Sequence, residues 1–245
     1  MIKSGMYCVI VLFALLLNAS NAIADGKVMY EFYPPSAEGT GKVYMGREIA
    51  HIMGYQGAAW LERENREKEE RTDVLIKSLN LQKGMIIADV GAGTGYLSRR
   101  MADSVGKSGA VYATDVQPEM IAKLKSFTKN YPNVKPVLSE TRQVNLAANT
   151  LDMAIMVDVY HELEYPYEVV QSIIAALKPN GQLVLVEYRA ESDSVPIKQT
   201  HKMTEAQVIK ELTVHPLTWE KTIETLPWQH VVIFSKSASN IQLTQ

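Results

Sequence analysis

Residues 85–96 read Met-Ile-Ile-Ala-Asp-Val-Gly-Ala-Gly-Thr-Gly-Tyr, an apolar run followed at once by a glycine-rich stretch. The apolar run has the length and composition of a buried strand. Gly91, Gly93 and Gly95 predict a turn that a ligand can approach closely, because glycine has no Cβ and tolerates positive φ. The helix expected to begin at Tyr96 would point its free N–H groups at that ligand. Together these features predict an α/β fold with a binding site for a nucleotide-like ligand.

The glycine spacing separates two classes of ligand. The dinucleotide fingerprint is G-x-G-x-x-G, with a pyrophosphate at the helix N-terminus. This chain has G-x-G-x-G instead, and Tyr96 stands where the last glycine of that fingerprint would be. An NAD(P)-linked oxidoreductase is therefore disfavoured, although it stays an alternative.

From residue 83 onward, apolar runs alternate with amphipathic segments, which is typical of a parallel sheet covered by helices. Strands are expected at residues 85–90, 109–116, 134–138, 151–159, 183–188, 219–225 and 230–235. Helices are expected at residues 96–105, 118–130, 167–177 and 203–212, the last capped by Thr204. The final two strands have no helix between them. The prediction is a Rossmann-like, seven-stranded, mostly parallel sheet with an antiparallel C-terminal edge hairpin.

Residues 25–82 are expected to form a loop and a helical lid in front of this domain, which would span residues 83–237. The predicted helix covers residues 58–79, and its charged middle is interpreted as a solvated face. The pairs Glu62–Arg66, Glu64–Lys68 and Glu67–Arg71 have favourable i,i+4 spacing. Residues 44–63 contain three glycines and are the expected lid.

The first residues have the pattern of a targeting segment. Lys3 precedes a twelve-residue apolar stretch, 6–17, and Ala22-Ile23-Ala24 offers a small-x-small cleavage site. This stretch is shorter than the roughly 20 apolar residues of a membrane span. We expect residues 1–24 to be a cleaved signal peptide and the mature chain to be periplasmic, without stable membrane insertion. An uncleaved anchor is the alternative, and residues 238–245 are expected to be a flexible tail.

Composition limits the other classes of function. The chain has 245 residues, 47% hydrophobic, so it can bury a full core, and its net charge of −2 gives no basic footprint. Nucleic acid is therefore not an expected partner. The one cysteine, Cys8, lies in the predicted signal peptide. The mature chain would have neither a disulfide nor a cysteine-based metal site.

Several motifs resemble those of class I S-adenosylmethionine (SAM) dependent methyltransferases. They are the glycine-rich stretch 89–98, Asp115, the strand 151–159 and Leu-Lys-Pro-Asn-Gly-Gln-Leu at 177–183. Within that superfamily, Val-Asp-Val-Tyr-His-Glu-Leu at 157–163 and the stretch 44–63 resemble a group of bacterial predicted methyltransferases, whose members often carry a secretion signal. The resemblance implies SAM as the cosubstrate and leaves the methyl acceptor open.

The SAM-binding residues are expected at the carboxyl ends of the first strands. Asp115 ends the second strand, where a carboxylate accepts hydrogen bonds from ribose hydroxyls. Asp89 would shape the glycine turn near the methionine moiety, Glu140 is a candidate for the adenine amino group, and Asp158 for the SAM amino group. The full expected set is Asp89, Gly91, Ala92, Gly93, Thr94, Gly95, Asp115, Val116, Glu140 and Asp158.

The acceptor side is expected at the end of the fourth strand and in the lid. Tyr160, His161 and Glu162 are the candidate catalytic residues. His161 is either a general base, because its ordinary pKa is near neutral, or a structural hydrogen-bonding group. Arg47, His51, Trp60 and Arg63 are the candidate substrate-binding residues, with arginines paired to Glu48 or Glu62 as the structural alternative. The five histidines show no close ligand spacing, so no metal site is expected.

The sequence thus predicts a SAM-dependent methyltransferase that acts on a small molecule by direct displacement. An exported, non-catalytic nucleoside-binding module with the same fold is a second alternative, because SAM is made in the cytoplasm. The oligomeric state is left open.

Overall fold

The computed structural model describes residues 23–24, 27–28 and 30–237. The two-residue strands β1 (Ile23–Ala24) and β2 (Lys27–Val28) pair with each other. The predicted signal peptide, apart from its last two residues, and the predicted tail lie outside the described residues.

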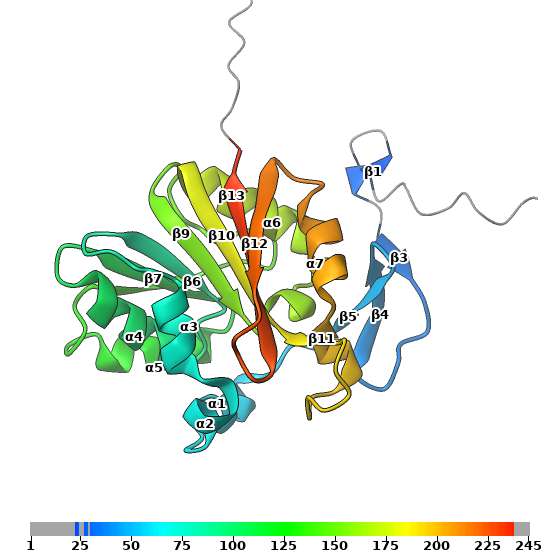
Figure 1. Cartoon of the computed structure of the whole chain (residues 1–245), viewed down its shortest axis with the longest axis horizontal. Helices are drawn as coiled ribbons and strands as arrows, with labels where there is room; N and C mark the ends of the chain where they lie inside the picture. Colours follow the sequence, from blue (N-terminus) through cyan, green and yellow to red (C-terminus); the bar gives the residue numbers. More distant parts are fainter. Residues whose placement is uncertain (1–22, 25–26, 29, 238–245) are drawn as a thin grey trace, which may run out of the picture.

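The central sheet has the strand order β12-β13-β10-β9-β6-β7-β8 (Figure 1). Its strands are β6 (Ile86–Val90), β7 (Ala110–Asp115), β8 (Val134–Leu138), β9 (Leu151–Val157), β10 (Leu177–Arg189), β12 (Leu217–Ile223) and β13 (Gln229–Lys236). Strands β6 to β10 are parallel, and β13 is antiparallel to both β10 and β12. The predicted sheet and edge hairpin are confirmed, and a short eighth strand, β11 (Lys202–Met203), pairs with β10.

Helices cover both faces of this sheet. One apolar cluster joins α3 (Thr72–Ser78), α4 (Tyr96–Val105) and α5 (Pro118–Phe127) to one face, and a second joins α6 (Pro166–Ala176) and α7 (Glu205–Leu212) to the other. Residues 153–157 of β9 alternate between the two clusters, as the period of a strand requires. The Thr204 hydroxyl accepts from the Gln207 N–H at 3.1 Å, which confirms the predicted cap of α7.

The order of the strands indicates where a ligand would bind. The chain passes from β6 outward through β7 to β8 and then returns to β9 on the other side of β6. Ligands of open α/β sheets bind at such a reversal, beyond the carboxyl ends of the strands. The glycine-rich turn, Asp115 and Asp158 lie at that edge of the sheet.

The N-terminal part differs from the prediction of a loop and a helix. It forms a separate antiparallel sheet of β3 (Tyr30–Phe32), β4 (Gly39–Tyr44) and β5 (Arg47–Ala50). The hairpin between β4 and β5 turns at Met45 and Gly46, which have φ of 51° and 89°. Because Met45 is not a usual left-handed residue, the sequence did not indicate this hairpin.

The long helix predicted at residues 58–79 is also wrong, because the chain forms the 3₁₀ turn η1 (Tyr55–Gly57) and then α1 (Ala58–Leu61), α2 (Arg66–Glu70) and α3. Arg71 has φ of 51° and breaks the helix between α2 and α3. The solvated face is wrong at Arg66 and Glu70, which are 5% and 2% exposed and pair with each other. The other ion pairs of this segment are Arg63–Glu69, Arg63–Glu70, Glu62–Arg99 and Arg71–Asp73 instead of those predicted.

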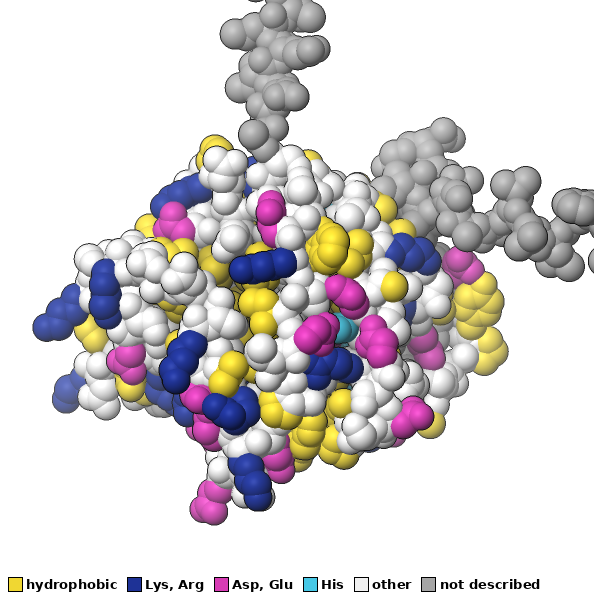
Figure 2. Space-filling view, in the orientation of Figure 1, with side chains coloured by type: hydrophobic (Ala, Val, Ile, Leu, Met, Phe, Trp, Pro, Cys, Tyr) yellow, Lys and Arg dark blue, Asp and Glu magenta, His cyan; other side chains and the backbone are white. Residues whose placement is uncertain are grey.

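Two observations bear on partners. None of the described helices has both the length and the apolar character needed to cross a bilayer. On the face drawn in Figure 2, Lys and Arg side chains are scattered among Asp and Glu. The absence of nucleic acid among the partners stays a prediction.

Candidate functional site

The glycine-rich turn lies directly between β6 and α4 and has a backbone that only glycine adopts easily. Gly91, Gly93 and Gly95 have φ of 72°, 55° and 79°. A Cβ on Gly91 would lie 2.7 Å from the side chain of Val159, and one on Gly93 would lie 2.5 Å from Cδ1 of Leu61. The glycines therefore serve both the turn and the close packing around it.

Backbone hydrogen bonds join this turn to the end of β7. The N–H groups of Gly91 and Ala92 both donate to the Thr114 carbonyl at 2.9 Å. The N–H of Gly93 donates to Asp115 Oδ2 at 3.0 Å, and that of Gln117 donates to Oδ1 at 2.9 Å. Asp115 is buried. The glycine-rich turn and the Asp115 carboxylate form one hydrogen-bonded unit at the switch point, where the strand order reverses. A carboxylate accepts about four hydrogen bonds, so this one retains acceptor capacity for a ligand.

Asp89 supports the turn from inside. The Ser98 hydroxyl donates to Asp89 Oδ2 at 2.5 Å, which ties the first turns of α4 to the end of β6. Burial raises the pKa of Asp89 to about 6, and the charge of Asp115 adds to this, while Ser98 and the charge of Arg66 oppose it. Burial likewise raises the pKa of Asp115, against the N–H groups of Gln117, Gly93 and Val116.

The remaining expected SAM residues lie along the same rim. Thr94 is buried, and its hydroxyl has no hydrogen-bond partner among the described residues. Val116 is half-buried and Glu140 is exposed. The Ser139 N–H donates to the Asp115 carbonyl at 2.9 Å, which holds the loop of Glu140 beside the end of β7. Glu140 is thus close to the site along the backbone, with its side chain in solvent.

Asp158 follows β9 and is a half-buried acid, one of whose oxygens is fully buried. It has φ of 55°, and its Oδ2 accepts from Gln229 Nε2 at 3.2 Å. Its Oδ1 is buried without a partner among the residues that the structure describes. Burial, followed by the charges of Glu70 and Glu187, raises the pKa of Asp158 well above its usual range. The site therefore has an unsatisfied acceptor at the switch point.

A buried ionic cluster around Glu70 lies next to Asp158 and was not predicted from the sequence. Glu70 accepts from Arg66 at 2.9 Å, from Arg63 at 2.6 Å and from the Tyr188 hydroxyl at 3.1 Å. The charge of Arg66 acts on both Asp89 and Asp158. The only signal in the sequence was the i,i+4 spacing of Arg66 and Glu70 within a charged run, a pattern that usually means exposure.

The acceptor-side residues form the 3₁₀ turn η2 (Tyr160–Glu162) after β9. His161 is 1% exposed, and its Nδ1 lies 2.5 Å from Glu187 Oε2. The other oxygen of Glu187 accepts from the Tyr160 N–H at 2.9 Å. Sequence reasoning missed Glu187, although a single acid in the apolar run of β10 was a usable signal. The Tyr160 hydroxyl is buried, and burial, aided by the charge of Glu211, raises its pKa.

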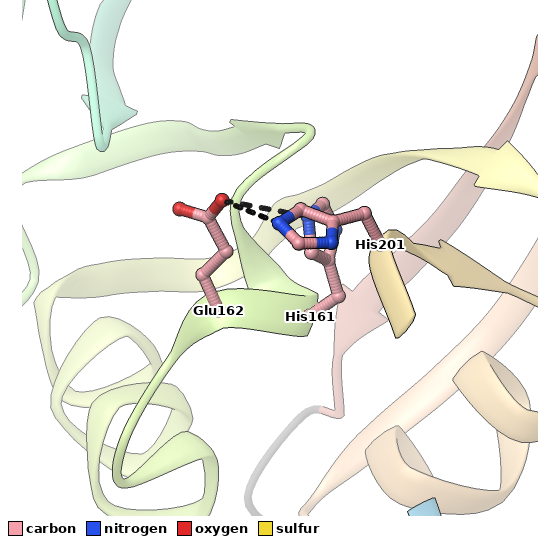
Figure 3. Close-up of side chains that lie close together, drawn as sticks. All are labelled: His161, Glu162 and His201. Atoms are coloured by element: carbon pink, nitrogen blue, oxygen red, sulfur yellow. Dashed lines mark ion pairs between the residues drawn. The ribbon is translucent and has the colours of Figure 1, made fainter. Parts of the chain in front are cut away.

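His201 joins His161 and Glu162 from a distant part of the chain (Figure 3). It lies in the turn η3 (Gln199–His201). Glu162 Oε1 is 3.8 Å from His161 Nε2 and 3.6 Å from His201 Nε2. Burial, followed by the charges of His161 and Lys198, lowers the pKa of His201 to about 4. Two imidazoles and a carboxylate therefore converge where the sequence predicted no metal site.

The two arginines of the expected substrate set are bound by carboxylates of the protein. Arg47 makes a two-pronged ion pair with Glu211, at 2.8 and 2.9 Å, and donates to the His161 carbonyl at 3.1 Å. Arg63 binds Glu69 and Glu70 and lies 3.7 Å from the ring centre of Trp60. Both arginines are therefore paired with carboxylates of the protein, which was the alternative to substrate binding. The partners are not Glu48 or Glu62, which the sequence had suggested. His51 and Trp60 are exposed.

One segment of the lid connects the glycine turn to the acceptor side. Gln117 donates to the Met53 carbonyl at 3.1 Å and accepts from the Tyr55 N–H at 2.7 Å. The Met53 N–H donates to Glu162 Oε2 at 3.1 Å. Since the Gln117 N–H also binds Asp115, a continuous chain of hydrogen bonds runs from Asp115 to Glu162.

Part of the chain is similar to known methyltransferases. Residues 87–181 match the model of a family described as "Methyltransferase domain". Ubiquinone/menaquinone biosynthesis C-methyltransferase UbiE of Neisseria gonorrhoeae is 28% identical over 114 residues, which cover 46% of each chain. The enzyme of that name from Pseudomonas paraeruginosa is 26% identical over 49% of this chain and 48% of its own length. The chain therefore spans about half the length of the curated relatives it matches.

Solved structures confirm the predicted fold. A SAM dependent methyltransferase from Aquifex aeolicus is 24% identical with a TM-score of 0.71, over 76% of this chain and all of that chain. The [4+2]-cyclase SpnF is 14% identical with a TM-score of 0.58, over 69% of this chain and 81% of its own. These proteins share a fold under different names, so the fold alone does not decide the activity.

Proposed function

We propose that this chain is a SAM-dependent methyltransferase that moves the methyl group of SAM to a small-molecule acceptor. The observation that carries the proposal is the unit of the glycine turn and Asp115. It presents a buried carboxylate with spare acceptor capacity at the switch point of the sheet. The match of residues 87–181 to a methyltransferase family supports the same conclusion.

The residues at this edge fit the parts of SAM. Asp115 would accept from the ribose hydroxyls, and the glycine turn would pack against the nucleoside, where side chains would block it. The free Oδ1 of Asp158 would accept from the amino group of the methionine moiety. Thr94, whose buried hydroxyl has no partner within the described part of the chain, is available to the same ligand. The proposed SAM site also includes Ala92, Val116 and Glu140, with Glu140 as the residue for the adenine amino group.

Methyl transfer would proceed by direct displacement. The acceptor atom forms a bond to the methyl carbon while the carbon–sulfur bond breaks, and its electron pair stays on sulfur as S-adenosylhomocysteine leaves. Alignment of acceptor and sulfonium supplies much of the rate, since a well-oriented pair avoids a large entropic cost. His161 Nε2 would take up the proton that the acceptor releases, with Glu162 beside it, because Glu187 binds Nδ1 and leaves Nε2 turned toward Glu162.

Calorimetric titration of SAM and of NAD into the purified protein tests this proposal. We expect SAM to bind, NAD not to bind, and Asp115→Asn to weaken SAM binding by at least about tenfold, or about 1.4 kcal/mol. Asp103→Asn is the matched control, because Asp103 is exposed on α4 and loses the same charge. Binding of NAD in place of SAM, or equal SAM affinity in the two variants, would refute the proposal.

We also propose that residues 1–24 direct export and are then removed. The support is the charge, apolar length and small-x-small site of this segment. The mass of the protein recovered from the periplasmic fraction tests this proposal. A chain that begins at Asp25 is expected, whereas a full-length chain held in the cytoplasm would contradict it.

A further inference from the structure

We infer that His161, Glu162 and His201 form a binding site for one divalent transition-metal ion. One ring nitrogen of each histidine and one carboxylate oxygen of Glu162 lie within 4.8 Å of one another (Figure 3). Two imidazoles with one carboxylate form a known ligand set for iron and zinc. No local spacing in the sequence shows this site, because the two histidines lie on separate turns, η2 and η3.

The distances suit a metal ion better than hydrogen bonds within the cluster. The separations of 3.6 and 3.8 Å between Glu162 Oε1 and the two nitrogens exceed hydrogen-bonding range. Ligand atoms about 2.1 Å from a tetrahedral ion lie roughly 3.4 Å apart. An inward rotation of the side chains would therefore bring the three ligand atoms to coordination distance.

Each ligand is also oriented by a second group, as in established metal centres. Glu187, which is fully buried, binds Nδ1 of His161 at 2.5 Å and leaves Nε2 for the ion. The Met53 N–H binds the other oxygen of Glu162 at 3.1 Å. The Thr200 hydroxyl lies 3.3 Å from Nδ1 of His201. A carboxylate–histidine pair of this kind fixes the tautomer that a metal ligand needs.

The ligand chemistry selects the class of ion. Imidazole nitrogens favour zinc, iron, cobalt, nickel or copper, whereas magnesium and calcium prefer sites made only of oxygen. Three protein ligands leave at least one position open for water or for an oxygen or nitrogen of a small molecule. Thr200, which precedes His201 in the chain, also lines an open hollow of about 380 Å³ between β5 and the start of α7.

The position of the ion would define the class of methyl acceptor, and this step rests on the proposed function. The hydrogen bonds through Gln117 and Met53 join Glu162 to Asp115, so the metal site adjoins the proposed SAM site. A hydroxyl group bound to a divalent ion loses its proton to solvent more readily, so in the metal-bound enzyme the ion activates the acceptor in place of His161. The acceptors that suit this arrangement carry a hydroxyl or enol oxygen at or next to the methylated atom.

Cobalt binding tests the site directly. Untagged protein treated with a chelator is titrated with Co²⁺ and followed by visible absorption, then challenged with Zn²⁺ and separately with Mg²⁺. We expect one equivalent of Co²⁺ to bind, Zn²⁺ to displace it, and Mg²⁺ to have no effect. His201→Gln and Glu162→Gln should abolish the signal, and Glu187→Gln should weaken binding by roughly 10- to 100-fold.

His215→Gln is the matched control, because His215 is a buried histidine that packs against Tyr167, away from the cluster. Its Co²⁺ binding should equal that of the unaltered protein, and thermal unfolding checks that every variant is folded. Failure to bind Co²⁺, or equal binding by the His201 and His215 variants, would overturn the inference. SAM titration of His201→Gln separates the two proposals. A variant that loses metal binding but still binds SAM is altered at the metal site alone, so the SAM site is judged independently.

Discussion

Replacement of Gly93 by alanine tests how closely the lid packs on the glycine turn. Gly93 has φ of 55°, and the new methyl group would lie 2.5 Å from Cδ1 of Leu61 in α1. An alanine in the left-handed region costs about 1–2 kcal/mol. Crowding in a packed site adds about 1–3 kcal/mol. Gly93→Ala should therefore lower the free energy of unfolding by about 2–5 kcal/mol in total.

Gly84→Ala is the matched control for this experiment. Gly84 also has positive φ, 90°, but its new methyl group would meet nothing closer than Ser108 Oγ at 3.7 Å. Its cost should be the backbone cost alone, about 1–2 kcal/mol. Urea unfolding of both variants, each with and without Leu61→Ala, measures the coupling between positions 61 and 93.

The reasoning predicts that Leu61→Ala recovers about 1–3 kcal/mol in the Gly93→Ala background and none in the Gly84→Ala background. SAM affinity should fall in Gly93→Ala and stay unchanged in Gly84→Ala. Equal costs for the two glycine variants, with no coupling to Leu61, would show that the lid does not lie on the turn.

Three further predictions follow from buried charges and a helix cap. The raised pKa of Asp89, from 3.8 to about 6, means that the folded state binds this proton more tightly, so stability should fall as pH rises from about 4 to about 6. The loss is about 3 kcal/mol at 1.36 kcal/mol per unit, and unfolding of Asp89→Asn measured against pH should lack this component. Arg66→Met should cost about 3–5 kcal/mol, because it leaves Glu70 buried with less compensation. Arg71→Met, which removes the exposed Arg71–Asp73 pair, should cost at most about 1 kcal/mol, and similar losses in the two variants would count against a buried pair. Thr204→Ala should cost about 1 kcal/mol in thermal or urea unfolding through loss of the α7 cap, and an unchanged stability would contradict that role.

The central sheet was predictable because each strand is a short apolar run between amphipathic segments. The glycine turn and α4 followed from the sequence of residues 85–105, where strand, turn and helix signals agree. Boundaries were harder at β10, which begins at Leu177 and changes register before Gln182. The turn predicted at residues 178–181 lies within that irregularity.

The N-terminal segment was not predictable for two physical reasons. Met45 and Arg71 adopt left-handed backbone conformations without the glycine or asparagine that usually marks them. The run of charges between Glu62 and Asp73 resembles a solvated surface, yet Arg66 and Glu70 are buried because they satisfy each other and Tyr188. Burial of charge depends on partners from other elements, which local sequence does not show.

The candidate site was partly predictable from topology. Parallel strands bring Asp115 and the residues after β9 to one edge, so their proximity follows from the strand order. Glu187 and His201 were missed, because a residue's contact with a distant turn depends on tertiary packing. As a result, the convergence of two histidines on Glu162 could be found only in the structure.

A crystal structure of the protein with S-adenosylhomocysteine tests the central claim most directly. The account predicts that both ribose hydroxyls lie within hydrogen-bonding distance of the Asp115 carboxylate, with the nucleoside against the turn of Gly91, Gly93 and Gly95. A nucleoside bound elsewhere, or one that leaves Asp115 without a contact, would contradict it.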